Sequence, residues 1–409
     1  MRTIKLGLFG LGTVGGGVVQ ILKKHREDFA HRAGVDIELA AVTARSVDEA
    51  APLGCAELYR TADEIFDDPQ IDIIIELIGG TGFARYVIER ALESGKHVVT
   101  ANKAVMASCG KQLMAMADEK GLFLAFEASV GGGIPIIGPL KHSLVGNEIS
   151  TVLGIVNGTT NYMLTRMDQD GLAYAEVLKE AQAKGFAEAD PTADVDGFDA
   201  AAKIAILASI AFNSRVTIDD VKPEGIRNIS PVDLEFARSM GYAIKLLAIA
   251  NRTEDGIDIR VHPTMIPLTH PMASVNGVYN AIYVIGDSVG ETMFFGQGAG
   301  RGPAASAVMG DIIEVARNIA AGVKPIVGCT CVDTLPIRPM SEIETKYYVR
   351  LSVKDQPGVL AATSKCFADH MVSVYSMMQV RDDDASDAQL VYLMHQTREA
   401  NLKIGRAHV

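Results

Sequence analysis

The stretch Ile4-Lys-Leu-Gly-Leu-Phe-Gly-Leu-Gly-Thr-Val-Gly-Gly-Gly-Val-Val-Gln20 decides the fold of this chain. Its apolar residues 4–9 predict a short buried strand, and the apolar-rich segment after Gly15 predicts a helix. Between them, Gly10 permits a tight turn, Gly12 lets the backbone approach a pyrophosphate, and Gly15 lets the helix pack close to the strand. Because these glycines join a strand to a helix, the pattern favours dinucleotide binding over a glycine-rich connection without a ligand.

The composition is that of a globular enzyme with two or three domains. The chain has 409 residues, of which 48% are hydrophobic and 22% charged, and its formal net charge is −12. This charge argues against a nucleic-acid partner. No run has the length of a transmembrane helix and no secretory signal is present, so we expect no membrane partner. The five scattered cysteines fit a reduced cytosol, which predicts a cytoplasmic protein.

Strands and helices alternate through residues 1–130, which predicts an α/β domain with a doubly wound parallel sheet of the Rossmann type. The basic cluster 23–26 is interpreted as the solvated end of the first helix. Further elements of this domain are expected as strands at 37–42, 71–77, 97–100 and 122–126, and as helices at 87–94 and up to residue 116.

Residues 131–327 are expected to form a second, α+β domain. It contains apolar strands at 152–156 and 281–285 and alanine-rich helices at 173–184 and 200–212, and a helix near 304–320 is predicted to return to the first domain. Residues 328–345 are interpreted as a linker that contains Cys329 and Cys331, for which structural thiols are favoured over a zinc site.

Residues 346–402 are expected to form a small third unit. Strands at 347–353, 372–380 and 389–395 and a helix at 359–370 match the beginning of a βαββαβ module, which stops before its second helix is complete. The last residues, 403–409, are interpreted as a non-native tail on a truncated chain.

Five sequence blocks together carry a family resemblance. They are residues 10–15, 76–80 (Glu-Leu-Ile-Gly-Gly), 100–104 (Thr-Ala-Asn-Lys-Ala), 157–161 (Asn-Gly-Thr-Thr-Asn) and 188–199 followed by Lys203. The chain resembles monofunctional homoserine dehydrogenase with a C-terminal ACT domain, and no aspartate-kinase segment precedes the dehydrogenase. The resemblance implies reversible NAD(P)H-dependent reduction of L-aspartate 4-semialdehyde to L-homoserine, on the route to threonine, methionine and isoleucine.

Two lysines are the candidate catalytic residues. Reducing an aldehyde requires a proton source beside the carbonyl oxygen. Lys103 follows a strand at the edge of the sheet where such folds bind ligands. Asp199 and Lys203 lie four residues apart and share a helix face; the apolar segment 200–208 favours a cleft over a surface ion pair. The resemblance implies that both lysines are catalytic, and we expect Lys203 to transfer the proton with help from Lys103.

The substrate carries an α-ammonium group, for which carboxylates are suitable partners. A calcium loop at 194–197 is disfavoured because Lys203 would occupy the position of the bidentate glutamate. Capping of a helix by Thr159 or Thr160 is an alternative use of the fourth block, 157–161. The resemblance implies that the substrate is bound by Glu188, Asp194, Asp199, Asn157, Gly158 and Thr159.

The preferred cofactor is expected to be NADP rather than NAD. The second strand ends without a carboxylate for the ribose 2′-hydroxyl, and Arg45 stands there as a partner for a 2′-phosphate. A glycine-rich loop at 295–303 is expected to close over the cofactor, as in the family. The cofactor-binding residues implied by motif and resemblance are Gly10, Gly12, Thr13, Val14, Gly15, Arg45, Gly79, Thr100, Lys103 and Gly296.

Three further expectations come from the resemblance. Backbone carbonyls of Glu127, Val130, Gly132 and Ile134 are implied to hold a monovalent cation, typically sodium, although a plain interdomain hinge explains this loop equally well. Residues 355–360 resemble the amino-acid-binding loop of ACT domains, which implies threonine feedback; a role in assembly alone is the alternative. We expect a homodimer or homotetramer.

Two other functions compete with this interpretation. One is a semialdehyde oxidoreductase that forms a thioester through Cys109, which has no histidine nearby in sequence. The other is a non-catalytic amino-acid sensor that retains nucleotide binding, which the presence of both lysines and all the acidic residues disfavours.

Overall fold

The computed structural model describes residues 2–325, 328–381 and 387–403. The chain forms two compact units. The first comprises Met1–Thr253 and Ile259–Leu335, and the second comprises Glu254–Asp258 and Pro336–Val409. The division at Leu335 falls inside the predicted linker, 328–345. Within the described ranges, every helix is too short or too polar to span a bilayer.

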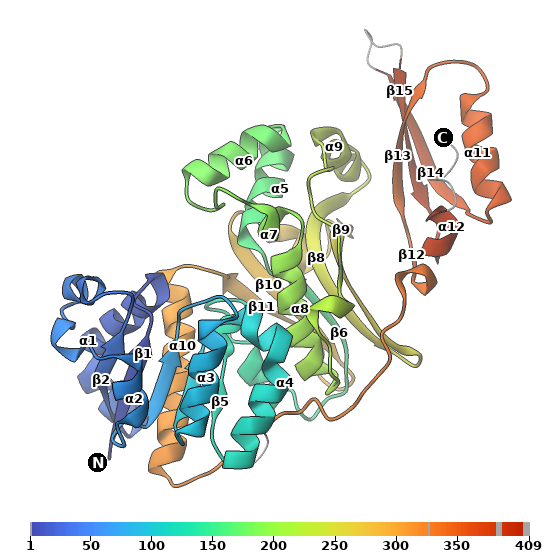
Figure 1. The fold of residues 1–409 in the computed structure, drawn as a ribbon. Coiled ribbons are helices and arrows are strands. Elements are labelled where there is room, and N and C mark those ends of the chain that lie inside the picture. Colours follow the sequence, from blue (N-terminus) through green and yellow to red (C-terminus); the bar gives the residue numbers. More distant parts are fainter. Residues whose placement is uncertain (1, 326–327, 382–386, 404–409) are drawn as a thin grey trace. The chain divides into compact units, whose positions relative to one another are not determined.

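The first unit begins with the parallel five-stranded sheet that the sequence predicts (Figure 1). Its strand order is β2-β1-β3-β4-β5, and each neighbouring pair is parallel. The fold class is therefore confirmed as α/β. The strands are β1 (Thr3–Phe9), β2 (Asp36–Thr43), β3 (Ile73–Glu76), β4 (His97–Thr100) and β5 (Leu124–Ala125).

Helices cover both faces of this sheet. α1 (Thr13–Ala33) and α10 (Arg301–Ala320) pack together over one face, so the late helix α10 lies against this first sheet. On the other face, the ring of Phe66 stacks on Phe9 with centroids 5.1 Å apart. The remaining helices of this part are α2 (Ala62–Asp67), α3 (Phe83–Glu93) and α4 (Lys103–Lys120).

The first helix is longer than predicted. It does not end at the basic cluster 23–26 but continues to Ala33, with one non-helical residue, His25, at φ −120°. Gly34 then adopts φ 74°, a left-handed conformation that ends helices readily because glycine has no Cβ. The charges at 23–26 therefore mark a local irregularity within the helix, and the glycine marks its end.

The rest of the first unit is a mixed six-stranded sheet with helices packed against it (Figure 1). Its order is β11-β10-β6-β8-β9-β7. The strands are β6 (Ile149–Ile155), β7 (Lys222–Pro223), β8 (Tyr242–Thr253), β9 (Gly256–Pro267), β10 (Tyr279–Gly286) and β11 (Gly290–Gln297). The helices are α5 (Gly158–Asp170), α6 (Tyr174–Ala183), α7 (Thr192–Val195), α8 (Phe198–Ala211) and α9 (Pro231–Ser239).

The second unit contains the elements of the predicted small module. Strands β13 (Tyr348–Lys354), β15 (Asp387–Met394) and β14 (Val374–Arg381) form an antiparallel sheet in that order, with α11 (Val359–Asp369) after β13. A short pair, β12 (Glu344–Thr345) and β16 (Thr397–Arg398), precedes the five-residue helix α12 (Glu399–Lys403). Most of the predicted non-native tail, residues 404–409, lies outside the described residues.

A partly buried histidine makes the stability of the first unit depend on pH. His97 Nδ1 accepts a hydrogen bond of 2.9 Å from the backbone N–H of Phe123. Burial lowers the pKa of His97 to about 4, although Asp72 opposes the shift. The unfolded chain, with an ordinary pKa near 6.5, therefore binds a proton more readily. The contribution of His97 to stability is present above pH 6.5 and is lost as the pH falls toward 4.

We predict that the free energy of unfolding falls by up to about 3 kcal/mol between pH 6.5 and pH 4 because of this group. The matched variant is His97→Asn, whose Oδ1 keeps an acceptor for the Phe123 N–H but does not titrate. Urea unfolding at both pH values should show a smaller pH dependence in His97→Asn than in the native chain. Equal pH dependence in the two proteins would contradict the assignment.

Candidate active site

Two helices from different parts of the first unit bring the predicted catalytic lysines to one carboxylate. Lys103 is the first residue of α4, and Asp199 and Lys203 lie one turn apart near the start of α8. Lys103 Nζ lies 2.8 Å from Asp199 Oδ1, and Lys203 Nζ lies 2.7 Å from Asp199 Oδ2. Lys203 Nζ also donates to the carbonyl oxygen of Val156 at 2.7 Å. The structure thus joins residues that are about a hundred positions apart in sequence.

The lysine–aspartate bridge, formed by Lys103, Asp199 and Lys203, is buried on one side and open on the other. Asp199 and Lys203 are buried, whereas the side chain of Lys103 is 45% exposed. Burial opposes the charge of Asp199, but Lys203 and Lys103 outweigh it and hold the pKa of this carboxyl far below its usual range. Burial likewise lowers the pKa of Lys103, but the nearby carboxylates, with Asp199 first, raise it overall. Asp199 and Lys103 are therefore both charged at neutral pH.

Asn157 organises the loop between β6 and α5. Its Nδ2 donates to Asp194 Oδ1 at 2.7 Å and to Asp199 Oδ2 at 2.9 Å. Its Oδ1 accepts a hydrogen bond from the backbone N–H of Thr160, which caps α5. The alternative for this block, a cap by Thr159 or Thr160, is therefore wrong, because the capping residue is Asn157. The amide has the geometry to serve as a cap and to bind carboxylates at once.

The two other predicted acids lie near the lysines but differ in environment. Asp194, on α7, is partly buried, and Glu188 is exposed in the preceding loop. Burial raises the pKa of Asp194, and the charge of Asp199 adds to this; the hydrogen bond from Asn157 and both lysines oppose it. The negative charges of Asp194 and Glu188 both help to raise the pKa of Lys103. The predicted acids thus surround the lysine pair.

Sequence reasoning quoted residues 76–80 but missed what Glu76 does. This fully buried residue ends β3, and its Oε1 accepts from the backbone N–H groups of Ile78, at 2.7 Å, and Gly79, at 3.3 Å. Its Oε2 accepts from Thr100 Oγ1 at 2.6 Å. The signal available in the sequence was a glutamate at the end of an apolar strand, because a carboxylate buried there needs hydrogen-bond partners. Glu76 fixes the 78–80 loop and the end of β4 together.

Asn102, also missed, continues this network to the lysine. Its side-chain oxygen accepts from the backbone N–H of Val105 and so caps α4, and its Nδ2 donates to the carbonyl oxygen of Gly80 at 2.8 Å. Its own N–H donates to Thr100 Oγ1. A cap directly before Lys103 sets the direction in which the helix begins, and so places the lysine.

The glycine turn has the shape that a pyrophosphate requires. Gly10 has φ 98°, and a Cβ there would lie 2.7 Å from the carbonyl oxygen of Leu77. A Cβ at Gly15 would lie 2.0 Å from the carbonyl oxygen of Gly10, whereas one at Gly12 would meet no atom within 4 Å. Space is therefore open beside Gly12 at the N-terminus of α1, whose first turn has no acidic residue. These features fit the phosphates of a dinucleotide.

The other predicted cofactor residues lie on several elements. Thr13 and Val14 begin α1, and a Cβ at Gly79 would meet no atom within 4 Å. The side chain of Arg45 lies just beyond β2, is 93% exposed and has its Nε 2.8 Å from Glu49 Oε1. Gly296 lies near the end of β11, at the start of the second glycine-rich loop.

A residue absent from the sequence predictions, Asn280, lies between two of the predicted loops. It is 1% exposed on β10, and neither polar atom of its carboxamide has a hydrogen-bond partner within the described ranges. Its amide lies beside Gly298, where a Cβ would come within 1.9 Å of Asn280 Nδ2, and near Gly158. A buried amide without partners is costly, so this group marks a place where a polar ligand atom or water completes the structure.

The loop predicted to hold sodium has a structural carboxylate. Glu127 accepts hydrogen bonds through its side chain from the backbone N–H groups of Ile136, Ile137 and Gly138. Among the described residues, no cluster of three or more metal-ligating side chains is present. A cation at this loop would therefore depend on backbone carbonyls.

Cys109, the nucleophile of the competing thioester reaction, is buried within α4. Its Sγ donates to the carbonyl oxygen of Val105 at 3.2 Å, and no histidine is among its hydrogen-bond partners in the described part of the chain. The thiol is therefore bonded within its own helix and is not part of the lysine–aspartate group.

Comparison with known proteins agrees with this geometry. Residues 135–313 match the homoserine dehydrogenase family, and residues 10–127 match its NAD-binding domain. A homoserine dehydrogenase from Synechocystis sp. is 46% identical over 414 aligned residues, which cover 98% of this chain and 94% of that protein.

Solved structures show the same similarity. The crystal structure of a homoserine dehydrogenase from Thiobacillus denitrificans superposes with a TM-score of 0.93 at 42% identity, covering 98% of this chain and 94% of that one. A hyperthermophilic archaeal homoserine dehydrogenase in complex with NADPH has a TM-score of 0.65 at 26% identity, covering 77% of this chain and 98% of that one.

Proposed function

Because the chain belongs to the homoserine dehydrogenase family, we propose that Lys203 and Lys103 carry out its reaction. The activity is the reversible NAD(P)-dependent interconversion of L-aspartate 4-semialdehyde and L-homoserine, in amino-acid biosynthesis. The observation that supports the assignment is the convergence of both ammonium groups on Asp199, at 2.8 and 2.7 Å.

The bound nicotinamide supplies the hydride for the carbonyl carbon of the aldehyde. The carbonyl oxygen then develops negative charge, which an ammonium group stabilises and neutralises by donating a proton. Lys203 is fixed by Asp199 and Val156, which suits proton transfer at a defined position. The half-exposed Lys103 assists from the side of the nucleotide domain.

Substrate binding is assigned to the carboxylates and the loop that surround the lysines. Both oxygens of Asp199 already contact lysines, so its first task here is to hold them. Asp194 and Glu188 are the acids available to the α-ammonium group of the substrate. Asn157 holds Asp194 in place. Gly158 and Thr159, which follow Asn157 at the start of α5, are proposed to bind the rest of the substrate.

NADP is the preferred cofactor in this proposal. Arg45 is exposed beyond β2 and is paired with Glu49 in an i,i+4 ion pair that a 2′-phosphate would replace. The archaeal relative was solved with NADPH, which supports the same preference. Gly10, Gly12 and Gly15 would hold the pyrophosphate, with Gly79 and Thr100 beside the nicotinamide half.

A monovalent cation, with sodium as the expected ion, is proposed at the turn that follows Glu127. The carbonyl oxygens of Val130, Gly132 and Ile134 accept no hydrogen bond from another residue in the described ranges, and hard cations prefer oxygen ligands of this kind. A Cβ at Gly132 would lie 2.4 Å from the carbonyl oxygen of Gly298. An ion here would therefore stiffen the turn against the loop that closes over the cofactor.

We also propose that the enzyme assembles as a homodimer or homotetramer. β11 is the edge strand of the six-stranded sheet and exposes Met293 and Phe295, the latter stacked on Tyr279 with centroids 5.1 Å apart. An exposed edge with large apolar side chains is stabilised when a second copy of the chain covers it.

Regulation is proposed to reside in the second unit, interpreted as an ACT domain. A cavity of about 650 Å³ is lined by Asp355, Gln356, Gly358 and Gln379, among others, beside the start of α11. The N-cap residue of this helix, Gly358, provides no side-chain cap, so its N–H groups suit a carboxylate. Asp355 suits an ammonium group. Together they fit a free amino acid, for which threonine is proposed.

The decisive test of the catalytic assignment is Lys203→Met, which keeps the apolar stem and removes the ammonium group. We expect kcat to fall by roughly 10²–10⁴-fold, measured as NADPH absorbance with L-aspartate 4-semialdehyde. Lys179→Met, an exposed lysine on α6, is the control and should keep full activity. Turnover above half of the native value in Lys203→Met would exclude Lys203 as the proton donor.

The cofactor assignment is tested with a matched pair of arginines. Arg45→Gln should lower kcat/KM for NADPH by about tenfold, the effect of roughly one charge-assisted hydrogen bond, and leave NADH unaffected. Arg85→Gln is the control, because Arg85 pairs with Glu89 at 2.7 Å in the same i,i+4 arrangement. If both variants change the NADPH-to-NADH ratio alike, Arg45 does not select the cofactor.

Threonine regulation is tested by adding L-threonine to the assay. We expect a lower rate with threonine, and Asp355→Asn should require at least tenfold more threonine for half the effect because it loses the charge that holds the ammonium group. Asp369→Asn, at the other end of α11 and paired with Lys365, should respond like the native enzyme. Equal sensitivity of all three proteins would place the effector elsewhere.

A further inference from the structure

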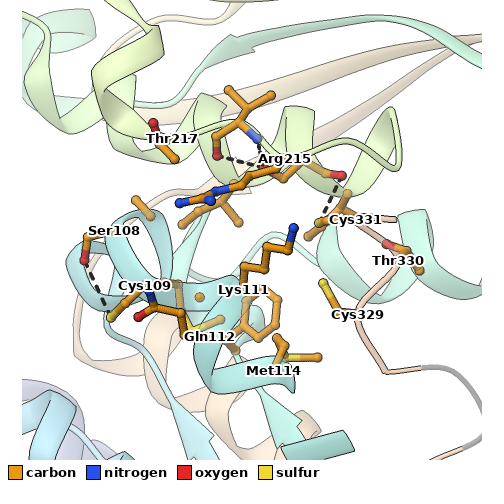
Figure 2. Close-up of a pocket in the computed structure, with 18 of the residues that line it drawn as sticks. Ser108, Cys109, Lys111, Gln112, Met114, Arg215, Thr217, Cys329, Thr330 and Cys331 are labelled. Carbon is orange, nitrogen blue, oxygen red and sulfur yellow. Dashed lines mark hydrogen bonds between the residues drawn. The ribbon is translucent and has the colours of Figure 1, made fainter. Parts of the chain in front are cut away.

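A second cavity lies along the two helices that carry the catalytic lysines (Figure 2). Its volume is about 670 Å³, including its mouth. α4 and α8, which pack against each other, form two of its walls, and residues 329–331 form another. None of the residues that line it belongs to the predicted substrate or cofactor sites. The cavity is therefore separate from the group formed by Lys103, Asp199 and Lys203.

The cavity is positively charged. Lys111, Lys141 and Arg215 line it, and no carboxylate is among the lining residues. Within the described ranges, none of these three cations forms an ion pair, although the whole chain has a net charge of −12. Figure 2 shows Lys111 and Arg215 on opposite sides of the space, both reaching into it. Unpaired cations around a concave site favour an anionic ligand.

The same walls also carry apolar side chains and one polar atom without a hydrogen-bond partner. Met106, Met114, Phe126 and Ile206 line the cavity. The hydroxyl oxygen of Thr330 is buried and has no hydrogen-bond partner in the described part of the chain. A small molecule with an apolar body and a negative charge fits these walls better than a bare inorganic ion does.

Two thiols, Cys329 and Cys331, lie at the edge of this charged space (Figure 2). Cys331 Sγ donates to the carbonyl oxygen of Ser209 at 3.4 Å. The neighbouring Cys331 thiol lowers the pKa of the Cys329 thiol, and Lys141 contributes while burial opposes. Cys329 and burial together raise the pKa of Cys331. Cys329 is thus the more acidic thiol of the pair, and the thiolate is the reactive form.

We propose that Cys329 is a modification site, where the cavity between α4 and α8 admits a small anionic disulfide that forms a mixed disulfide with this thiol. The Cys329 sulfur attacks one sulfur of the incoming disulfide and a new S–S bond forms. The original S–S bond breaks, and its other half leaves as a thiolate that carries the electron pair. The incoming disulfide is the oxidant, and a small free thiol reverses the step.

The adduct would act on catalysis through the helices. This part of the inference depends on the proposed roles of Lys103 and Lys203. Met106 and Lys111, which line the cavity, lie about one and two turns beyond Lys103 on α4, and Ile206 lies one turn beyond Lys203 on α8. A group wedged between these helices would alter the distance from Lys103 to Asp199 and lower the turnover.

The site is tested by comparing an anionic and a neutral aromatic disulfide. The anionic probe is 5,5′-dithiobis(2-nitrobenzoate) and the neutral probe is 4,4′-dithiodipyridine, each applied to the full chain with Cys366→Ser, which removes an exposed thiol. Peptide mapping by mass spectrometry should locate the first adduct at Cys329, with the anionic probe reacting at least tenfold faster there than with Cys55 or Cys109. A first adduct on either of those cysteines would overturn the proposal.

Charge recognition is tested with Lys111→Met and Arg215→Met together. The double variant should slow the anionic probe at Cys329 at least fivefold more than the neutral probe, because it removes charge and keeps much of the side-chain volume. An equal effect on both probes would show that the cations play no part in recognition. Circular dichroism and thermal unfolding confirm that the variant is folded.

The effect on turnover is measured separately. Cys329→Ser should have native activity and be insensitive to the anionic probe, whereas the parent protein should lose at least half of its turnover on modification and regain it with dithiothreitol. A Cys329 adduct with full activity would refute the link to the lysines. If the chain shows no dehydrogenase activity at all, the proposed function fails, while the mapping experiment still decides the modification site.

Discussion

The carboxylate of Asp199 is the point on which the proposed active site depends. It is buried, and both of its oxygens contact lysine ammonium groups, one from α4 and one from α8. A buried charge without partners is very costly, and one with two opposite charges at hydrogen-bond distance is tolerated. The same contacts therefore keep Asp199 ionised and hold the nucleotide-binding sheet's helix against the helix of the second sheet. Without this carboxylate, two buried or half-buried cations would face each other and repel.

Further polar networks support the lysine–aspartate bridge from both sides. On the side of the first sheet, buried Glu76 and Asn102 fix the 78–80 loop and the start of α4. On the other side, Asn157 contacts Asp199 and caps α5 at the same time. Each of these side chains satisfies backbone groups that would otherwise be unpaired at an element end. The geometry of the proposed site is thus built from helix caps and strand ends, which explains why it lies where elements terminate.

Much of this could be predicted from sequence because the signals are local. The glycine turn at residues 10–15, the apolar parallel strands and the i,i+4 spacing of Asp199 and Lys203 all depend on neighbours along the chain. The pairing of Lys103 with Asp199 could not, because nothing local links two helices about a hundred residues apart. The hairpin of β8 and β9 was missed although Asp255-Gly256 is a common turn signal. The predicted end of α1 was wrong because the basic residues 23–26 were interpreted as the end of the helix, whereas the helix ends at Gly34.

The three acids of the proposed site differ in how many of their carboxylate oxygens already have partners. This difference decides which of them can bind a substrate ammonium group. Asp199 has no free oxygen, whereas Asp194 has one oxygen bonded to Asn157 and Glu188 is exposed. Burial and the neighbouring charge of Asp199 raise the pKa of Asp194, so its ionised form is the less stabilised of the two aspartates. An ammonium group that arrives beside Asp194 relieves this cost, whereas the same group beside Asp199 would have to displace a lysine. In the proposed site, substrate binding would therefore add a cation where one is missing and leave the lysine pair intact.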